Sequence, residues 1–156
     1  MGNKGPRKTG KCDVDVIGLI AMEIVRAELT DAEILAKLNQ HLIEDEQHPN
    51  PMNIAQLTER MKEWLATDYI CYVAKERGHI IAYCLYRDDG GHYYMRQLYV
   101  DRAHRRKGIA TQLLDWLYKN VWTDKKVRLD VLAHNKDAVA FYKRYGFRIG
   151  VFRMEK

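Results

Sequence analysis

Apolar residues recur along this chain with two different periods, which predict strands that alternate with helices. Short apolar or alternating runs predict strands at residues 23–27, 69–74, 80–86, 92–100, 127–133 and 147–154. A spacing of three to four residues predicts helices that begin after Thr30, at Ile54, at Ile109 and after Asn135. Strands and helices interleaved in this order predict a mixed α/β sheet covered by helices.

Local signals predict where the first helix begins and ends. Thr30 is a predicted N-cap, and Glu33 three residues later would complete a capping box. Pro49 and Pro51 predict the end of this helix, because proline lacks a backbone donor and restricts the residue before it.

Length and composition are those of one globular domain. The chain has 156 residues, of which 47% are hydrophobic and 30% are charged, and a domain of this size buries a core without disulfides. Its three cysteines, Cys12, Cys71 and Cys84, show no C-x-x-C spacing. We therefore expect reduced thiols in a cytoplasmic protein, with no disulfide framework and no metal site. No apolar run approaches the roughly 18 residues of a membrane span, so we expect no membrane partner.

Positive charge is concentrated near the amino terminus. The formal net charge is +5, and Lys4, Arg7, Lys8 and Lys11 contribute four of these charges without a compensating acid. We expect residues 1–21 to form a basic extension that either adds a strand or is disordered, and residues 22–156 to form the domain. The extension alone would suit nucleic acid, but the rest of the chain is nearly neutral, so nucleic acid is not the expected partner.

The transition from the strand at 92–100 to the helix at Ile109 carries the strongest functional signal. Arg105, Arg106 and Lys107 precede Gly108, which opens an amphipathic helix. The first amides of a helix lack internal partners and carry partial positive charge, so they bind phosphate groups. Glycine lets a ligand approach the backbone closely because it has no Cβ. The segment therefore predicts a diphosphate site, although the P-loop and dinucleotide-binding patterns are both absent.

Two motifs resemble those of the GNAT superfamily of N-acetyltransferases, which use acetyl-CoA. Arg105-x-x-Gly108-x-Ala110 resembles the [QR]-x-x-G-x-[GA] motif of this superfamily. The segment Asn135–Phe147 resembles its N-x-x-A-x-x-[FL]-Y-x-x-x-G-F motif. The two motifs stand in the order found in the superfamily, with one predicted strand between them.

The resemblance implies a fold and a coenzyme site. It implies an α/β fold with a mixed, mostly antiparallel central sheet of six or seven strands, flanking helices and splayed central strands. Here the splayed strands would be His92–Val100 and Val127–Ala133, with the coenzyme between them. The residues that match coenzyme-contacting positions are Leu98, Tyr99, Val100, Arg105, Arg106, Lys107, Gly108, Ile109, Ala110, Thr111 and Asn135. For Asn135, capping of the helix that follows is an alternative explanation.

The resemblance also implies a general acid. Tyr142 matches the tyrosine that protonates the leaving thiolate in this superfamily. The alternative is a core tyrosine, because Tyr142 shares an inward helical face with Ala138, Phe141 and Tyr145.

Several residues are candidates for the base that accepts the proton of the amine. Asp130 matches a strand carboxylate that some members of the superfamily use, but a surface Asp paired with Arg128 or a lysine is the competing interpretation. Gln97 occupies a region where other members carry a glutamate, and an amide cannot act as a base. His92 and His134 are weaker alternatives.

The acceptor side is predicted from the end of the first helix. Glu44, Asp45 and Glu46 place three carboxylates together, and Asp45 and Glu46 are candidate contacts for a cationic amine. A solvated helix end is the competing interpretation.

These patterns together predict an acetyl-CoA-dependent N-acetyltransferase. The acetyl group would pass to a primary amine, that of a cationic small molecule, by direct attack in a ternary complex. One alternative is a protein acetyltransferase that acts on an N-terminal or lysine amine. A second alternative is a non-catalytic regulatory protein that binds acyl-CoA. A homodimer is compatible with the resemblance.

Overall fold

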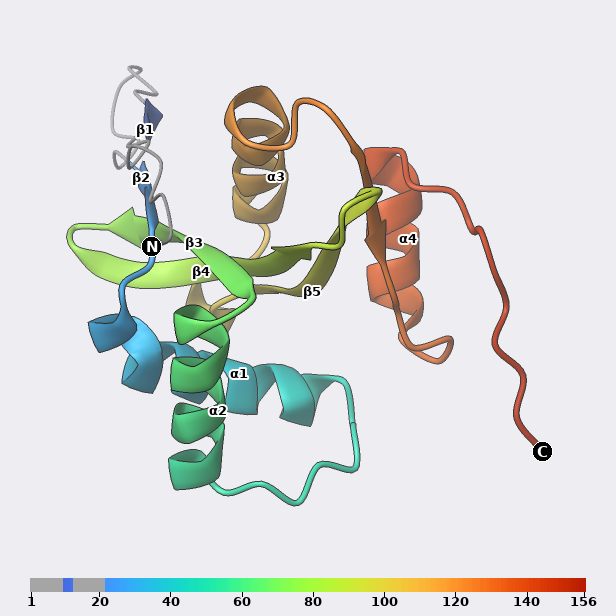
Figure 1. Ribbon diagram of the computed structural model, residues 1–156, viewed down its shortest axis with the longest axis horizontal. Coiled ribbons are helices and arrows are strands. Elements are labelled where there is room, and N and C mark those ends of the chain that lie inside the picture. Colours follow the sequence, from blue (N-terminus) through green and yellow to red (C-terminus); the bar gives the residue numbers. More distant parts are fainter. Residues whose placement is uncertain (1–9, 13–21) are drawn as a thin grey trace.

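The computed structural model describes residues 10–12 and 22–156. Within this part of the chain, six strands form one sheet in the order β1-β2-β3-β4-β5-β6 (Figure 1). The strands are β1 (Gly10–Cys12), β2 (Met22–Arg26), β3 (Tyr69–Glu76), β4 (His79–Asp88), β5 (His92–Val100) and β6 (Lys126–Leu129). Neighbours from β1 to β5 pair antiparallel, and β5 pairs with β6 in parallel. The expected mixed, mostly antiparallel sheet is therefore confirmed.

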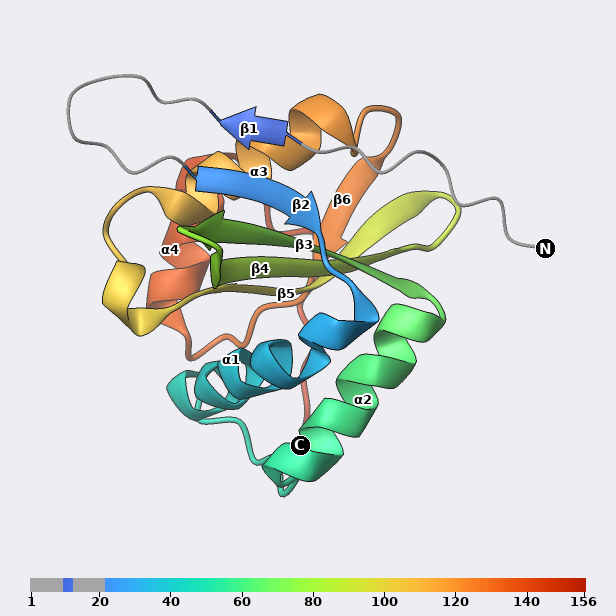
Figure 2. The same ribbon diagram turned by 90° about the vertical axis from the view of Figure 1, so that its left-hand side faces the viewer.

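Two pairs of helices cover the two faces of this sheet (Figure 2). The helices are α1 (Ala32–Asp45), α2 (Ile54–Ala66), α3 (Ile109–Asn120) and α4 (Lys136–Tyr145). α1 and α2 pack on one face, where Leu35 and Met61 join Val73 in a buried cluster. α3 packs on the opposite face, where Leu113 and Leu117 lie in a second cluster, and α4 borders that cluster.

The central strands β3 and β4 are buried on both faces, which explains their sequence. Every side chain from Cys71 to Ala74 and from Ile81 to Tyr86 is buried. Alternate residues enter the two clusters, since successive side chains of a strand point to opposite faces. Continuous apolar runs, and not a polar alternation, are typical of such doubly covered strands.

The sheet opens between β5 and β6. Their pairing runs from His92 opposite Lys126 to Met95 opposite Leu129, where β6 ends. From Arg96 to Val100, β5 has β4 as its only strand neighbour among the described residues. The predicted splay of these two strands is therefore present, although the second strand ends at Leu129 and not at residue 133.

A bulge marks the point where the two strands separate. Leu85 of β4 lies opposite Gln97, whereas the next residue, Tyr86, lies opposite Met95, so Arg96 is an extra residue in β5. Bulges occur frequently next to active sites, where they redirect side chains and free backbone groups from pairing.

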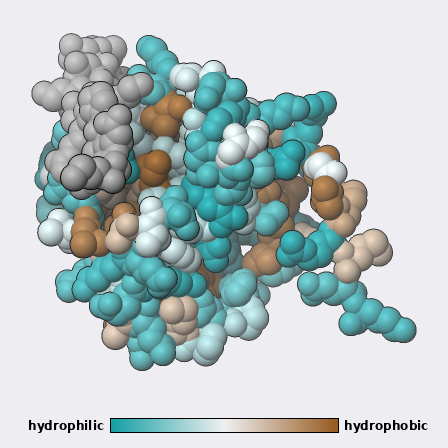
Figure 3. Space-filling model, viewed as in Figure 1, coloured by the Kyte–Doolittle hydropathy of each residue, from teal (hydrophilic) through white to brown (hydrophobic). Residues whose placement is uncertain are grey.

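The expected final strand at 147–154 is wrong. These residues form no strand, and the side chains of Ile149, Val151 and Met154 are 53%, 86% and 91% exposed. Figure 3 shows this segment standing away from the body of the protein, with hydrophobic residues along it. Alternating apolar residues predict a strand only if a neighbouring strand supplies hydrogen bonds, and this segment has none.

The predicted start of the first helix is also wrong in detail. Residues Leu29–Asp31 form a short 3-10 turn before α1, and the Glu28 amide donates to Asp31 Oδ2 at 2.8 Å. Glu28 is therefore the N-cap of this turn and forms a reciprocal capping box with Asp31, and Thr30 is not the cap.

The predicted amino-terminal extension falls almost entirely outside the described residues. Residues 10–12 alone are described there, and they add a short strand to the edge of the sheet next to β2. In the described part of the chain, no helix has the length and apolar character to cross a membrane. The same part contains no cluster of three His, Cys, Asp or Glu residues arranged to hold a metal ion.

Candidate active site

A cleft of about 660 Å³ lies where β5 and β6 separate. Its walls come from β5, the start of α3, the end of β6, the inner face of α4 and the end of α1. The sequence-predicted coenzyme, catalytic and acceptor residues line this cleft, except Lys107 and the alternative bases His92 and His134. Residues that are up to about 100 positions apart in the chain are thus brought to one cavity, as Asp45 and Tyr142 illustrate.

One end of the cleft is formed by the first turn of α3. Gly108 is the N-cap of this helix, with φ +70° in the left-handed region, and no side chain caps the helix. Arg106, two residues earlier, is also left-handed with φ +63°, a conformation that is uncommon for residues other than glycine. The amides of Ile109, Ala110 and Thr111 have no acceptor in their own helix. They line the cleft and are suited to bind an anionic group such as a diphosphate.

Arg102 and Arg105 connect this turn to the end of α1. The Arg105 guanidinium donates to Asp45 Oδ2 and to the Val100 carbonyl. Arg102 donates to Asp45 Oδ1 at 2.8 Å and to Glu44 Oε2 at 3.1 Å. The partial burial of Asp45 raises its pKa, but the hydrogen bonds and charges of the two arginines outweigh this effect, so the pKa of Asp45 is lowered. Asp45 and Glu44 are therefore paired with arginines, and the attraction of a cationic amine by these acids stays a prediction.

The start of α4 supplies two of the predicted residues. The Asn135 side chain accepts from the Ala138 amide at 3.2 Å, which confirms its capping role. Tyr142, two turns later, lines the cleft and packs its ring edge-on against Phe141 and Phe147. Burial, together with the nearby Cys84 and Glu46, raises the pKa of Tyr142. Its hydroxyl therefore keeps its proton at neutral pH and is available as a donor inside the cleft.

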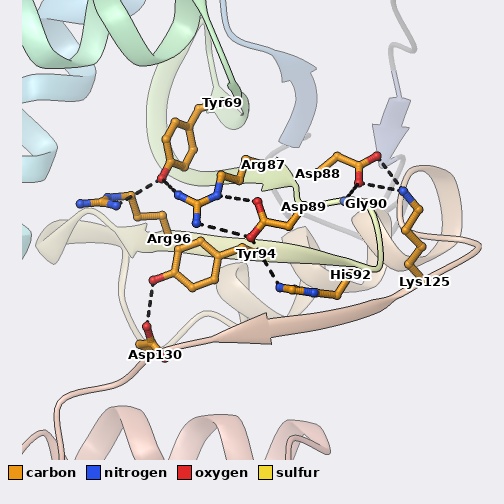
Figure 4. A network of polar contacts seen from close by, with 10 residues as sticks. All are labelled: Tyr69, Arg87, Asp88, Asp89, Gly90, His92, Tyr94, Arg96, Lys125 and Asp130. Atoms are coloured by element: carbon orange, nitrogen blue, oxygen red, sulfur yellow. Dashed lines mark hydrogen bonds and ion pairs between the residues drawn. The ribbon is translucent and has the colours of Figure 1, made fainter. Parts of the chain in front are cut away.

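Asp130 lies at the end of β6, on the open rim of the cleft. Its Oδ2 accepts from the Tyr94 hydroxyl at 3.1 Å (Figure 4). The partner is thus a tyrosine, and the pairing with Arg128 or a lysine that the competing interpretation required does not occur among the described residues. The side chain of Asp130 is exposed.

Glu46 is a carboxylate whose environment differs from that of Asp130. It follows the last residue of α1, lines the cleft and is only partly exposed. Burial raises the pKa of Glu46, against the opposing charges of His48 and His134. Glu46 and Tyr142 line the same cleft, and the charge of Glu46 contributes to the raised pKa of Tyr142. The sequence identified Glu46 as an acceptor contact, and its character as a potential base emerges only from the folded structure.

The histidines and Gln97 have other partners. The His134 Nε2 lies 2.9 Å from the Glu46 carbonyl, and His92 lies 3.5 Å from Asp89, outside the cleft. Gln97 accepts from the buried Tyr83 hydroxyl at 2.9 Å. These contacts hold β5 and α1 in place beside the cleft.

Comparison with known proteins supports the same conclusion as the geometry. Residues 35–147 match the Acetyltransferase (GNAT) family. An N-alpha-acetyltransferase of Sulfurisphaera tokodaii is 30% identical, in a match that covers 80% of this chain and 79% of that protein.

Solved structures share the fold at lower sequence identity. A possible acetyltransferase from Clostridium difficile has a TM-score of 0.75 at 23% identity, covering 86% of this chain and 95% of that one. A predicted acetyltransferase from Clostridium acetobutylicum, solved with acetyl-CoA, has a TM-score of 0.68 at 23% identity, with the same two coverages. The splayed sheet, the glycine-capped helix and the family match agree, and the chain belongs to the acetyltransferase (GNAT) family.

Proposed function

We propose that this protein transfers the acetyl group of acetyl-CoA to a primary amine. The observation that carries the proposal is the single cleft that joins the uncapped start of α3 to Tyr142. A diphosphate bound by the α3 amides would leave the rest of the coenzyme to extend along the unpaired part of β5. Leu98, Tyr99 and Val100 line the cleft there, and β6 does not pair with β5 at these positions.

The chemistry needs a base, an oxyanion site and an acid, and the cleft offers candidates for each. Acetyl-CoA supplies an activated thioester carbonyl. The backbone amides of β5 next to the bulge, which β6 does not pair, would stabilise negative charge on the carbonyl oxygen. Tyr142, which keeps its proton because its pKa is raised, would donate that proton to the departing thiolate.

We propose Glu46 as the base that accepts the proton of the amine, in preference to Asp130. The raised pKa of Glu46 brings it closer to neutrality, which makes it a more effective proton acceptor than an ordinary surface carboxylate. Asp130 is exposed and already accepts a hydrogen bond from Tyr94. A direct attack of the amine on the thioester then requires no covalent enzyme intermediate.

We propose an α-amine as the acceptor in place of a cationic small molecule. Two of the three carboxylates expected to attract a cation, Glu44 and Asp45, are paired with Arg102 and Arg105. The relative with 30% identity is an N-alpha-acetyltransferase, and its match extends over most of both chains. Both observations favour an amino acid or peptide amine over a polycation.

Release of CoA with a panel of amines tests this proposal. We expect turnover with acetyl-CoA and at least one primary amine, and a loss of about 10²-fold or more in kcat for Tyr142→Phe with little change in CoA affinity. Glu46→Gln should remove the acidic limb of the pH–rate profile, whereas Asp130→Asn should leave that limb in place. Tight CoA binding without turnover for any amine would instead support a regulatory acyl-CoA-binding protein.

A further inference from the structure

Two arginines beside the cleft lack acidic partners. Arg96 is the extra residue of the β5 bulge, and its exposed side chain lines the cleft. Its Nη1 donates to the Tyr69 hydroxyl at 3.2 Å, which is a neutral acceptor (Figure 4). Arg60 of α2 donates to the neutral side chain of Asn39 at 3.0 Å. Within the described part of the chain, neither guanidinium makes an ion pair.

Trp64 lies in contact with both of these guanidinium groups. The Cζ atom of Arg60 is 4.3 Å from the centre of its ring, and that of Arg96 is 4.7 Å away. Cation–π contacts of this kind hold a guanidinium at a fixed place and leave its N–H groups available. Two positive charges are thus fixed around one aromatic ring.

The charge of this group is not balanced by its surroundings. The Nε atom of Arg60 is buried without a hydrogen-bond partner among the described residues. Burial and, after it, the charge of Arg96 lower the pKa of Arg60. By contrast, Arg87 shares the Tyr69 hydroxyl with Arg96 but is paired with Asp89 at 2.6 Å.

Arg96 places its remaining donors on the acceptor side of the cleft, whereas Arg60 lines a separate groove along α2. Arg96 precedes Gln97 and Leu98 in the strand that carries the proposed acetyl site, and its side chain points to the face covered by α1 and α2. Glu46 borders the same cleft from the end of α1. A molecule whose amine reaches Glu46 therefore has Arg96 within the same cavity.

We propose that the acceptor carries a carboxylate, which binds to Arg96 beside Trp64 while its amine is acetylated. This inference rests on the proposed function and adds the chemical class of the acceptor. Guanidinium groups bind carboxylates through charge-assisted, often bidentate hydrogen bonds. Such an anion would engage donors that the fold leaves without a charged partner. The carboxylate belongs either to a free acidic amino acid or to an acidic residue close to the N-terminus of a peptide.

Matched acceptors test the proposal. Initial rates of CoA release are compared for the peptide Ala-Asp-Asp-Ala and its neutral counterpart Ala-Asn-Asn-Ala, and for free glutamate and glutamine. We expect a KM about fivefold to tenfold lower for the acidic member of at least one pair. Preference within the peptide pair identifies a peptide acceptor, and preference within the amino-acid pair identifies a small acceptor. Equal or higher KM for the acidic member of both pairs would overturn the proposal.

Two variants connect this preference to the arginines. Arg96→Gln should remove most of the acidic preference while the rate with the neutral member stays nearly unchanged, and Arg60→Gln should reduce the preference less. Arg26→Gln is the matched control, because Arg26 is an exposed arginine of β2, which β3 and β4 separate from β5. The control should keep the acidic preference, and an acidic preference that survives in Arg96→Gln would refute the assignment.

A binding measurement separates this proposal from the enzymatic one. Tryptophan fluorescence is titrated with Ala-Asp-Asp-Ala in the presence of CoA, with Trp64→Phe as the reference for the signal of this residue. Saturable change that is lost in Arg96→Gln supports the carboxylate site whether or not acetylation follows. Turnover of neutral amines without any such change would refute the carboxylate site and leave the proposed function intact.

Discussion

Replacing Gly108 with alanine tests how the start of α3 is built. The backbone of Gly108 has φ +70°, and a Cβ at this position would meet nothing closer than Gln112 Nε2 at 4.0 Å. The free protein therefore has room for the methyl group and carries only the backbone cost, about 1–2 kcal/mol for an L-residue in the left-handed region. For a domain of this size, we expect the melting temperature to fall by about 2–8 °C.

We also expect the Gly108→Ala variant to bind CoA more weakly, and this effect is separate from its loss of fold stability. A methyl group on Gly108 would stand beside the α3 amides, where we expect the diphosphate to bind. Losing one hydrogen bond to a charged group costs about 1.5–3 kcal/mol, which corresponds to an increase of roughly 10- to 150-fold in Kd. Isothermal titration calorimetry with CoA, at a temperature where both proteins are folded, measures this change.

Gly90→Ala is the matched control for this experiment. Gly90 has φ +87° and open space around its Cα, but it lies in the turn between β4 and β5, outside the cleft. The control should lose a similar amount of stability and keep the wild-type Kd for CoA. If Gly108→Ala loses stability but binds CoA as tightly as the wild type, the diphosphate does not bind at this turn.

Three further predictions concern stability and reactivity. Tyr83→Phe should lower the free energy of unfolding by about 1–3 kcal/mol in urea titrations, because it leaves the Gln97 side chain without its donor. The pKa of Asp45 is lowered from 3.8, so its contribution to stability is present at neutral pH and is lost as the pH falls through the folded-state pKa. Asp45→Asn should therefore cost under about 1 kcal/mol at pH 7 and should reduce the acid sensitivity of the melting temperature below about pH 4. Burial raises the pKa of the Cys71 and Cys84 thiols, so peptide mapping should find both unmodified by a thiol reagent until denaturant is added.

The elements that the sequence predicted well are those with a strong local signal. The strand His92–Val100 was expected with the bounds that β5 has, and the helix at Ile109 begins where Gly108 predicts. Asn135 caps α4 as expected, because an N-cap depends on neighbours three residues away. The effects of glycine, asparagine and helical periodicity depend on residues nearby in the chain, so the sequence alone is sufficient to predict them.

The features that the sequence did not reveal depend on distant partners. The neutralisation of Asp45 needs Arg105, which is 60 residues away in the chain. The prediction of a final strand at residues 147–154 was wrong because periodicity does not indicate whether a neighbouring strand exists. The raised pKa of Glu46 follows from burial in a cleft that forms only when α1 meets β5. Three acids at the carboxyl end of a helix interact unfavourably with the helix dipole. In the sequence, this arrangement was the one sign that these acids have structural or functional partners.

A co-crystal structure with CoA would show whether the start of α3 and Tyr142 bind one coenzyme together. We expect a diphosphate bound to the amides from Gly108 to Thr111, and the CoA sulfur within hydrogen-bond distance of the Tyr142 hydroxyl. A diphosphate bound elsewhere on the protein, or a sulfur directed away from Tyr142, would contradict the proposed function.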